Sequence, residues 1–167
     1  AMTVLEADYP VGAGRGPLSD RPFGLLFEAL DDLKEGEIYI ATGSSFDYAL
    51  WGGLMATRAT YLKAAGAVLN GFIRDCDEIN KLEFSVFSRG SYAQDQGVRG
   101  KVVDYRVPIS IEGVRIHSGD LIVADDEGVI IIPSQVEDEA IAAALETAAT
   151  ESEVAKAIRQ GMSTCEA

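Results

Sequence analysis

The second half of the chain contains the pattern that most restricts its fold. Between residues 101 and 133, short β-branched and apolar runs alternate with turn sequences. The runs are residues 102–103, 105–111, 114–116, 121–124 and 129–132. The turns include Glu112-Gly113, Ser118-Gly119-Asp120 and residues 125–128, in which glycine supplies the positive φ that a tight reversal needs. This half therefore predicts strands joined by hairpins.

A helix follows these strands. Ser134 and Glu137 match the S-x-x-E capping box, and a largely small or apolar stripe runs from Ile141 onward at helical spacing. Acidic residues fill the first turn, Lys156 and Arg159 lie in the last, and Gly161 follows, as the helix dipole favours. The pattern predicts a C-terminal helix over residues 134–161.

The first half mixes helices with short strands. Glycines and prolines in residues 1–21 indicate an irregular lead-in. Beyond it, apolar spacing predicts helices over residues 23–34, 46–65 and 75–82, and strands over residues 37–41, 67–70 and 84–87. Gly52-Gly53 interrupts the second helical stretch, so a new helix is expected to start near Leu54. Together the two halves predict one α/β domain over residues 1–167, with mixed sheets and a substantial antiparallel component.

The charge excludes several classes of partner. The 167 residues include 14 Lys and Arg against 27 Asp and Glu, which gives a net charge of −13 at pH 7. Without a basic stripe, direct binding to nucleic acid or to an anionic membrane surface is not expected. No apolar run reaches the roughly 18 residues of a membrane span. The two cysteines, Cys76 and Cys165, form no metal-binding pattern, and a cytoplasmic protein is expected.

Gly52 and Gly53 mark a candidate anion site. The first backbone N–H groups of the helix that follows, those of Leu54 and Met55, have no partner within the helix. Glycines allow a ligand to approach such groups closely, and the helix dipole favours negative charge there. The sequence is equally compatible with a helix break that serves packing alone.

A second candidate follows a predicted buried strand. Arg74 and Asp75 lie just past the carboxyl end of the strand predicted over residues 67–70, where open α/β sheets place ligands. Asp75, with Glu78 one turn further along, could hold a hydrated divalent cation, because Mg²⁺ is commonly bound by one or two carboxylates and several waters. The alternative is structural, with Asp75 capping the following helix and Arg74 paired with a surface acid.

Three motifs resemble the RraA-like superfamily. They are Leu50-Trp51-Gly52-Gly53-Leu54, the run GFIRDCDEI at residues 71–79, and the run GDLIVADDEGV at residues 119–129. This superfamily includes 4-hydroxy-4-methyl-2-oxoglutarate aldolases, which also decarboxylate oxaloacetate, and regulators of RNase E activity. The resemblance implies a β/β/α swivelling-domain fold closed by a C-terminal helix. It also implies a homotrimer or hexamer with sites between subunits.

The resemblance assigns roles to the candidate residues. The amides after Gly52 and Gly53, those of Leu54 and Met55, would hold the carboxylate of a pyruvate-like substrate. Arg74 would contact its keto oxygen and stabilise the enolate.

The same resemblance assigns the metal ligands. Asp75 would ligate Mg²⁺ or Mn²⁺ with support from Glu78, and Glu151 would come from the terminal helix of a neighbouring subunit. A divalent cation and a guanidinium both stabilise negative charge on an enolate oxygen.

The chain departs from the family pattern at Gly53. It reads G-x20-R-D-x2-E, whereas the characterised aldolases resemble D/E-x20-R-D, with a carboxylate in place of Gly53. Family members also carry several tens of residues before the position of Met2, so the chain looks shortened.

The favoured prediction is a divalent-metal-dependent lyase that cleaves or decarboxylates a small 2-oxo acid to pyruvate. The alternatives are a non-catalytic regulator that binds an RNA-processing enzyme such as RNase E, and a structural trimer with a vestigial site.

Overall fold

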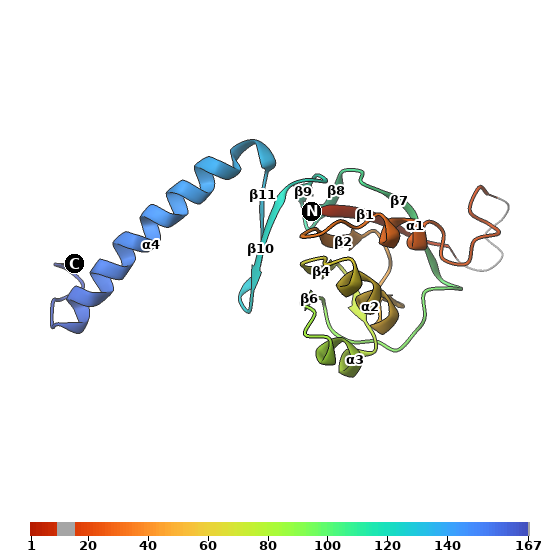
Figure 1. The fold of residues 1–167 in the computed structure, drawn as a ribbon, viewed down its shortest axis with the longest axis horizontal. Helices are drawn as coiled ribbons and strands as arrows, with labels where there is room; N and C mark the ends of the chain where they lie inside the picture. The colour runs from red at the N-terminus through yellow and green to blue at the C-terminus, as the bar shows by residue number, and fades with distance from the viewer. Residues whose placement is uncertain (10–15, 167) are drawn as a thin grey trace. The chain divides into compact units, whose positions relative to one another are not determined.

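The computed structural model describes residues 1–9 and 16–166. The chain forms two compact units, Ala1–Ile131 and Ile132–Ala167, and each is described by itself. The first unit contains helices α1 to α3 and the sheets, and the second contains the long helix α4 (Figure 1).

A five-stranded sheet forms the centre of the first unit, in the order β6-β4-β2-β1-β7. Its first four strands are parallel, and β7 runs antiparallel to β1. The strands are β1 (Met2–Asp8), β2 (Ile38–Thr42), β4 (Gly66–Leu69), β6 (Val86–Phe87) and β7 (Gly100–Tyr105). Because β1 and β2 are covered on both faces, nearly all of their side chains are buried or half-buried.

Each face of this sheet has its own apolar core. Met2, Val4 and Tyr39 pack on one face against three short helices. These are α1 (Leu26–Asp31), α2 (Gly53–Tyr61) and α3 (Cys76–Lys81). Ile40 and Val68 pack on the other face against the hairpins of the second half. Those hairpins are built from β8 (Ile109–Ile111), β9 (Val114–Ile116), β10 (Leu121–Asp125) and β11 (Gly128–Ile132).

The prediction of an irregular lead-in is wrong for residues 2–8, which form the strand β1. Met2 pairs with Tyr39 of β2, and Val4 pairs with Tyr105 of β7, so both partners are distant in sequence. The lead-in prediction also covered residues 10–15, which lie outside the described residues. The sequence of β1 alone does not mark it as a strand, because its hydrogen-bond partners lie far along the chain.

The prediction of a helix over residues 46–65 is correct only for the part that follows the glycine pair. Residues before the glycine pair form the strand β3 (Ala49–Trp51), which pairs in parallel with β5 (Phe72–Ile73). Every side chain of β3 is buried, and periodicity alone cannot distinguish a fully buried strand from a buried helix segment. After the break, α2 begins at Gly53, next to the predicted start.

Arg106 ties the edge of the sheet to the loop that precedes β2. Its guanidinium donates to both carboxylate oxygens of Glu37 at 2.8 Å and also contacts the Asp32 side chain. These hydrogen bonds raise the pKa of Arg106 further above its usual range. Burial acts to raise the pKa of Glu37, but hydrogen bonds from Arg106 and from the Lys34 backbone outweigh it and lower that pKa.

The second unit consists mainly of α4 (Glu137–Arg159), preceded by a 3₁₀ turn, Ser134–Val136. The helix thus begins three residues later than predicted, and its N-cap residue is Val136, which forms no side-chain capping hydrogen bond. None of its side chains is buried, and Ile141 and Leu145 are exposed. Among the described helices, none has the length and apolar composition needed to cross a bilayer. The mixed α/β fold with a C-terminal helix is confirmed.

Candidate active site

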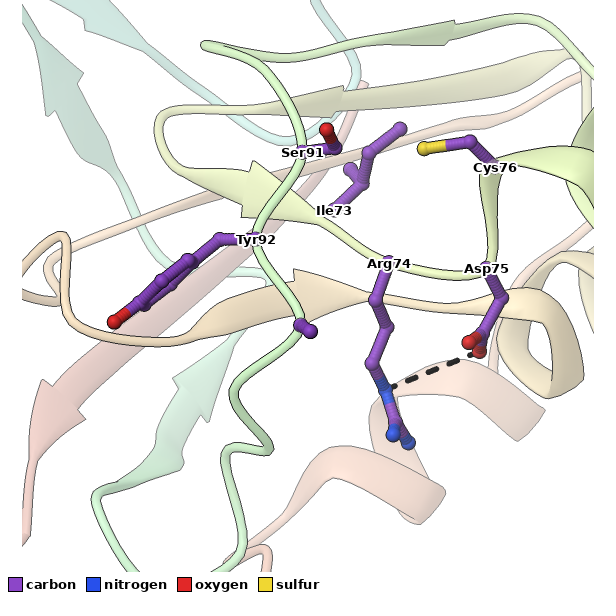
Figure 2. A pocket seen from close by; sticks show the side chains of 7 residues that line it. Ile73, Arg74, Asp75, Cys76, Ser91 and Tyr92 are labelled. Atoms are coloured by element: carbon purple, nitrogen blue, oxygen red, sulfur yellow. Dashed lines mark ion pairs between the residues drawn. The ribbon is translucent and has the colours of Figure 1, made fainter.

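A cavity of about 350 Å³ opens where β5 leads into α3. Residues 73–76 line one side of it, and residues 91–93 line the other (Figure 2). The Arg74 and Asp75 side chains lie next to one another there, with Arg74 Nε 3.9 Å from Asp75 Oδ2. The predicted site residues Arg74 and Asp75 therefore both line this cavity.

Strand pairing brings the two predicted motifs together. Trp51 of β3 lies beside Ile73 of β5, and the Arg74 backbone N–H donates to the Trp51 carbonyl at 2.9 Å. The residues that follow the two strands, Gly52-Gly53 and Arg74-Asp75, are consequently neighbours. The glycine pair and the Arg-Asp pair thus form one site.

Asp75 has an unusual backbone conformation that aims its side chain at α2. It adopts the left-handed conformation, with φ 60° and ψ 37°, which is uncommon for a residue other than glycine. Its Oδ2 accepts a hydrogen bond from the Gly53 N–H at 3.0 Å, and it gives no side-chain cap to α3. The expectation that Asp75 caps the helix that follows it is therefore wrong, because it caps α2 instead.

The two glycines make room for the acidic side chains. A Cβ on Gly52 would lie 2.9 Å from Asp75 Oδ2, closer than real Cβ atoms approach. A Cβ on Gly53 would overlap Glu78 Oε2 and would lie 3.3 Å from Asp75 Cβ. The glycine pair is thus required for close approach of both carboxylates, and Glu78 occupies the space beside the position where the resembling aldolases carry an acid.

The predicted anion-binding amides lie at the same place. The first hydrogen bond inside α2 runs from the Ala56 N–H to the Gly52 carbonyl. Asp75 takes the amide of Gly53, and the amides of Leu54 and Met55 precede the first residue with an intrahelical acceptor. They face the helix end at which Asp75 already supplies a negative charge.

Arg74 has a second acidic neighbour that the sequence did not identify. Its Nη2 lies 3.2 Å from Oδ2 of Asp95, which is half exposed. The alternative expectation, that Arg74 pairs with a surface acid, is confirmed to this extent. Asp95 lies in an aperiodic segment, and its only sequence signal is the turn-forming run Asp95-Gln96-Gly97. Ser91 and Tyr92, which line the cavity, were missed for the same reason.

Asp75 and Glu78 suit a hydrated divalent cation. Both carboxylates approach Gly53, and no donor among the described residues contacts Asp75 Oδ1. Across residues 1–9 and 16–166, no cluster of three or more His, Cys, Asp or Glu forms a protein-only cage. Two carboxylates completed by waters match the way Mg²⁺ is commonly held.

Glu151 belongs to the second unit. It lies on α4, and its side chain is exposed. Its contribution to the site of a neighbouring subunit stays a prediction.

Comparison with known proteins places the chain in a family. The sequence model of the RraA-like family, described as Aldolase/RraA, matches residues 1–131. Protein DlpA of Legionella pneumophila is 33% identical over 128 residues, a segment that covers 77% of this chain but only 21% of DlpA. An Arabidopsis thaliana protein named "Putative 4-hydroxy-4-methyl-2-oxoglutarate aldolase 2" is 33% identical over 115 residues, or 68% of each chain.

A solved structure confirms the fold. RraAS2 of Streptomyces coelicolor, described as an unusual member of the RNase ES inhibitor RraA protein family, superposes with a TM-score of 0.75 at 22% identity. The superposition covers 92% of this chain and 74% of RraAS2. Family model, relatives and fold agree with the motifs that meet at Gly53, and the chain belongs to the RraA-like family.

Proposed function

We propose that this protein is a divalent-metal-dependent lyase that cleaves or decarboxylates a small 2-oxo acid to give pyruvate. The observation that carries the proposal is the meeting of Arg74, Asp75 and Glu78 at the amino end of α2. The aldolase names of relatives in the same family support it.

Asp75 and Glu78 would hold the cation, Mg²⁺ or Mn²⁺. When bound there, such an ion supplies a Lewis acid beside the substrate's keto oxygen. The Asp75 side chain is already fixed by the Gly53 amide, so one carboxylate oxygen is held in place before any ligand arrives.

The chain's own residues would bind and orient the substrate. The amides of Leu54 and Met55 donate hydrogen bonds to the substrate carboxylate, aided by the positive end of the helix dipole. The Arg74 guanidinium would contact the keto oxygen, on which negative charge accumulates as the bond from the neighbouring α carbon to the departing carbon breaks. Donors fixed in place before the reaction stabilise that charge without reorganising.

The charge distribution favours a cation at this site. The net charge of −13 repels an anionic substrate at long range, and Asp75 repels it at the amino end of α2. A bound cation neutralises Asp75 and Glu78 locally. Substrate capture would then depend on that cation, on Arg74 and on the helix amides.

We also propose a homotrimer or hexamer in which Glu151 reaches the site of a neighbouring chain. Exposed apolar side chains on α4, among them Ile141 and Leu145, support association. Light scattering coupled to size exclusion is expected to give three or six times the 17.8 kDa chain mass. A monomer at micromolar concentration would contradict the oligomer.

A direct assay tests the lyase. Pyruvate release from oxaloacetate and from 4-hydroxy-4-methyl-2-oxoglutarate is measured with added Mg²⁺ or Mn²⁺, and again with EDTA. We expect turnover above the spontaneous rate that EDTA abolishes. If neither substrate releases pyruvate faster with the protein than in metal-containing buffer alone, the proposal is overturned.

The acidic composition favours a second candidate, a non-catalytic regulator that binds a basic surface of an RNA-processing enzyme such as RNase E. Its distinguishing result is capture of RNase E by the purified protein with no metal-dependent turnover. The Arg74→Lys variant would then bind RNase E as well as wild type.

A further inference from the structure

The segment that carries Asp95 is fixed by a buried hydrogen bond. Gln96 Nε2 donates to Glu6 Oε2 at 2.5 Å, and the two side chains are only 5% and 2% exposed. Glu6 lies on β1, an interior strand of the five-stranded sheet that pairs with β2 and β7. A polar pair buried in this way anchors its loop to the sheet, because separating the two groups would leave both without partners in the core.

Asp95 itself is held at one of its two carboxylate oxygens. Oδ1 accepts the Gly97 N–H at 2.6 Å, and the Asp95 backbone carbonyl accepts Arg99 Nη1 at 2.9 Å. The other oxygen, Oδ2, contacts Arg74 Nη2 at 3.2 Å. The Asp95 carboxylate is therefore oriented by its own segment, independently of the Arg74 guanidinium.

The same segment is also tied to the strand that leads into the site. The Ala49 N–H donates to the Gln94 carbonyl at 2.9 Å, and Ala49 begins β3. Asp95 is thus connected to the core on one side through Gln96 and to β3 on the other through Gln94.

We propose that Asp95 is a positioning residue that holds the Arg74 guanidinium away from Asp75, and that the Glu6–Gln96 hydrogen bond holds Asp95 in place. Arg74 lies between two carboxylates, with Asp95 at 3.2 Å and Asp75 at 3.9 Å. A guanidinium released from Asp95 would move freely and contact Asp75 part of the time, and there it would compete with any cation for that carboxylate. An exposed ion pair between mobile side chains is worth little, so the fixed direction of Asp95 decides which acid Arg74 prefers.

NMR of the arginine side chains tests the proposal without any assay of activity. In ¹⁵N-labelled protein, Arg74→Lys identifies the Nε–Hε signal of Arg74. Asp95→Asn keeps the shape and the acceptor for Gly97 but removes the charge that faces Arg74. We expect the order parameter of that Nε–Hε group to fall below about 0.6, the range of flexible groups. Asp20→Asn, at an exposed turn residue, is the matched control and leaves the signal unchanged.

Two further variants test the buried anchor. Glu6→Gln retains a carbonyl acceptor for Gln96 and is expected to keep the Arg74 signal rigid. Gln96→Met keeps the volume but removes the donor, and is expected to loosen Arg74 as Asp95→Asn does. A rigid Arg74 signal in folded Asp95→Asn overturns the proposal, and a rigid signal in folded Gln96→Met overturns the part assigned to Glu6. If Gln96→Met does not fold, Glu6→Met removes the acceptor instead, and a rigid signal in folded Glu6→Met overturns the same part.

The kinetic readout rests on the proposed function, whereas the NMR readout does not. Asp95→Asn is expected to raise the concentration of Mn²⁺ that gives half-maximal pyruvate release about tenfold, with a smaller change in the KM for oxaloacetate. If the wild type is inactive but its rigid Arg74 side chain becomes flexible in Asp95→Asn, the lyase is rejected and the positioning role stands. If the wild type is active and Asp95→Asn needs the same Mn²⁺ concentration as the wild type, the positioning role is rejected and the lyase stands.

Discussion

The Asp75 carboxylate accepts a hydrogen bond from the Gly53 backbone N–H at 3.0 Å, so the residue that precedes α3 caps α2. Such a contact would stabilise a helix even in a protein without activity. The left-handed backbone of Asp75, however, costs of order 1–3 kcal/mol, and conformations of this kind concentrate at functional sites. Capping and metal binding can be separated experimentally, because they depend on different properties of the same side chain.

Asparagine and alanine at position 75 separate these roles. Asp75→Asn keeps an acceptor for Gly53 and tolerates the left-handed conformation, so we expect near-normal stability with loss of metal-dependent turnover. Asp75→Ala also removes the cap, which is expected to lower the free energy of unfolding by about 1 kcal/mol. Urea denaturation and pyruvate release measure the two effects. Full activity in Asp75→Asn would leave the carboxylate with only its capping role.

Gly53 and Glu78 are expected to be energetically coupled. Because a Cβ on Gly53 would overlap Glu78 Oε2, Gly53→Ala is expected to cost about 1–3 kcal/mol, as other overpacking substitutions do. Glu78→Ala removes the obstructing carboxylate, so the double variant should lose less stability than the sum of the two single variants. A double-mutant cycle in urea measures the difference. Simple additivity would show that Glu78 does not lie against Gly53.

Stability is expected to fall as the pH rises through the range in which Glu6 titrates. Burial raises the pKa of Glu6 from 4.5 to about 8. Between these values the folded protein keeps the proton that the unfolded chain releases. The contribution of Glu6 is therefore fully present below about pH 4.5, and it is lost at up to about 1.4 kcal/mol per pH unit as the pH approaches 8.

Glu6→Gln is expected to remove that slope. The neighbouring phenols of Tyr39 and Tyr48 stay neutral in this range, because burial, with the nearby Glu6 charge, raises the pKa of each. The half-buried amino terminus, whose pKa is lowered by partial burial, contributes equally to wild type and variant. Thermal unfolding from pH 5 to 8 measures the difference between them, with Glu127→Gln in an exposed turn as control. Parallel pH profiles would show that the Glu6 carboxyl is not buried as described.

Arg106 is expected to contribute to stability through its fork-like contact with Glu37. Arg106→Lys cannot reproduce two parallel hydrogen bonds to one carboxylate, so we expect a loss of about 1–2 kcal/mol in urea, against little change in Arg115→Lys. The pKa of Glu37 is lowered in the folded protein, so this contribution is present above its ordinary pKa and is lost as the pH falls below it. The difference between wild type and Arg106→Lys should therefore shrink in acid. A constant difference down to pH 3 would contradict the assigned pair.

The features predicted correctly from the sequence are those with a local cause. The start of α2 follows from the break at Gly52-Gly53, and the hairpins of the second half follow from glycine turns between β-branched runs. The features that were missed depend on distant partners. β1 is a strand because β2 and β7 cover its edges, and β3 is a strand because β5 pairs with it.

The site shows the same division. Arg74, Asp75 and Glu78 could be identified because they follow a buried strand in a recognisable motif. Asp95 could not, because no periodic pattern marks its segment and its role depends on how Gln96 inserts into the core. The sequence also assigned Asp75 to the wrong helix, since its left-handed backbone is not visible in the residue type.

Binding of Mn²⁺ to the wild type and to Asp75→Asn, followed by electron paramagnetic resonance of the free ion, tests whether the Asp75 carboxylate is a metal ligand. It requires no knowledge of the physiological substrate, and Asp126→Asn, at an exposed turn residue, serves as the control. We expect one bound Mn²⁺ per chain in the wild type and in Asp126→Asn, and at least a tenfold weaker affinity in folded Asp75→Asn. Equal binding by the wild type and Asp75→Asn, or none by the wild type, would contradict this expectation.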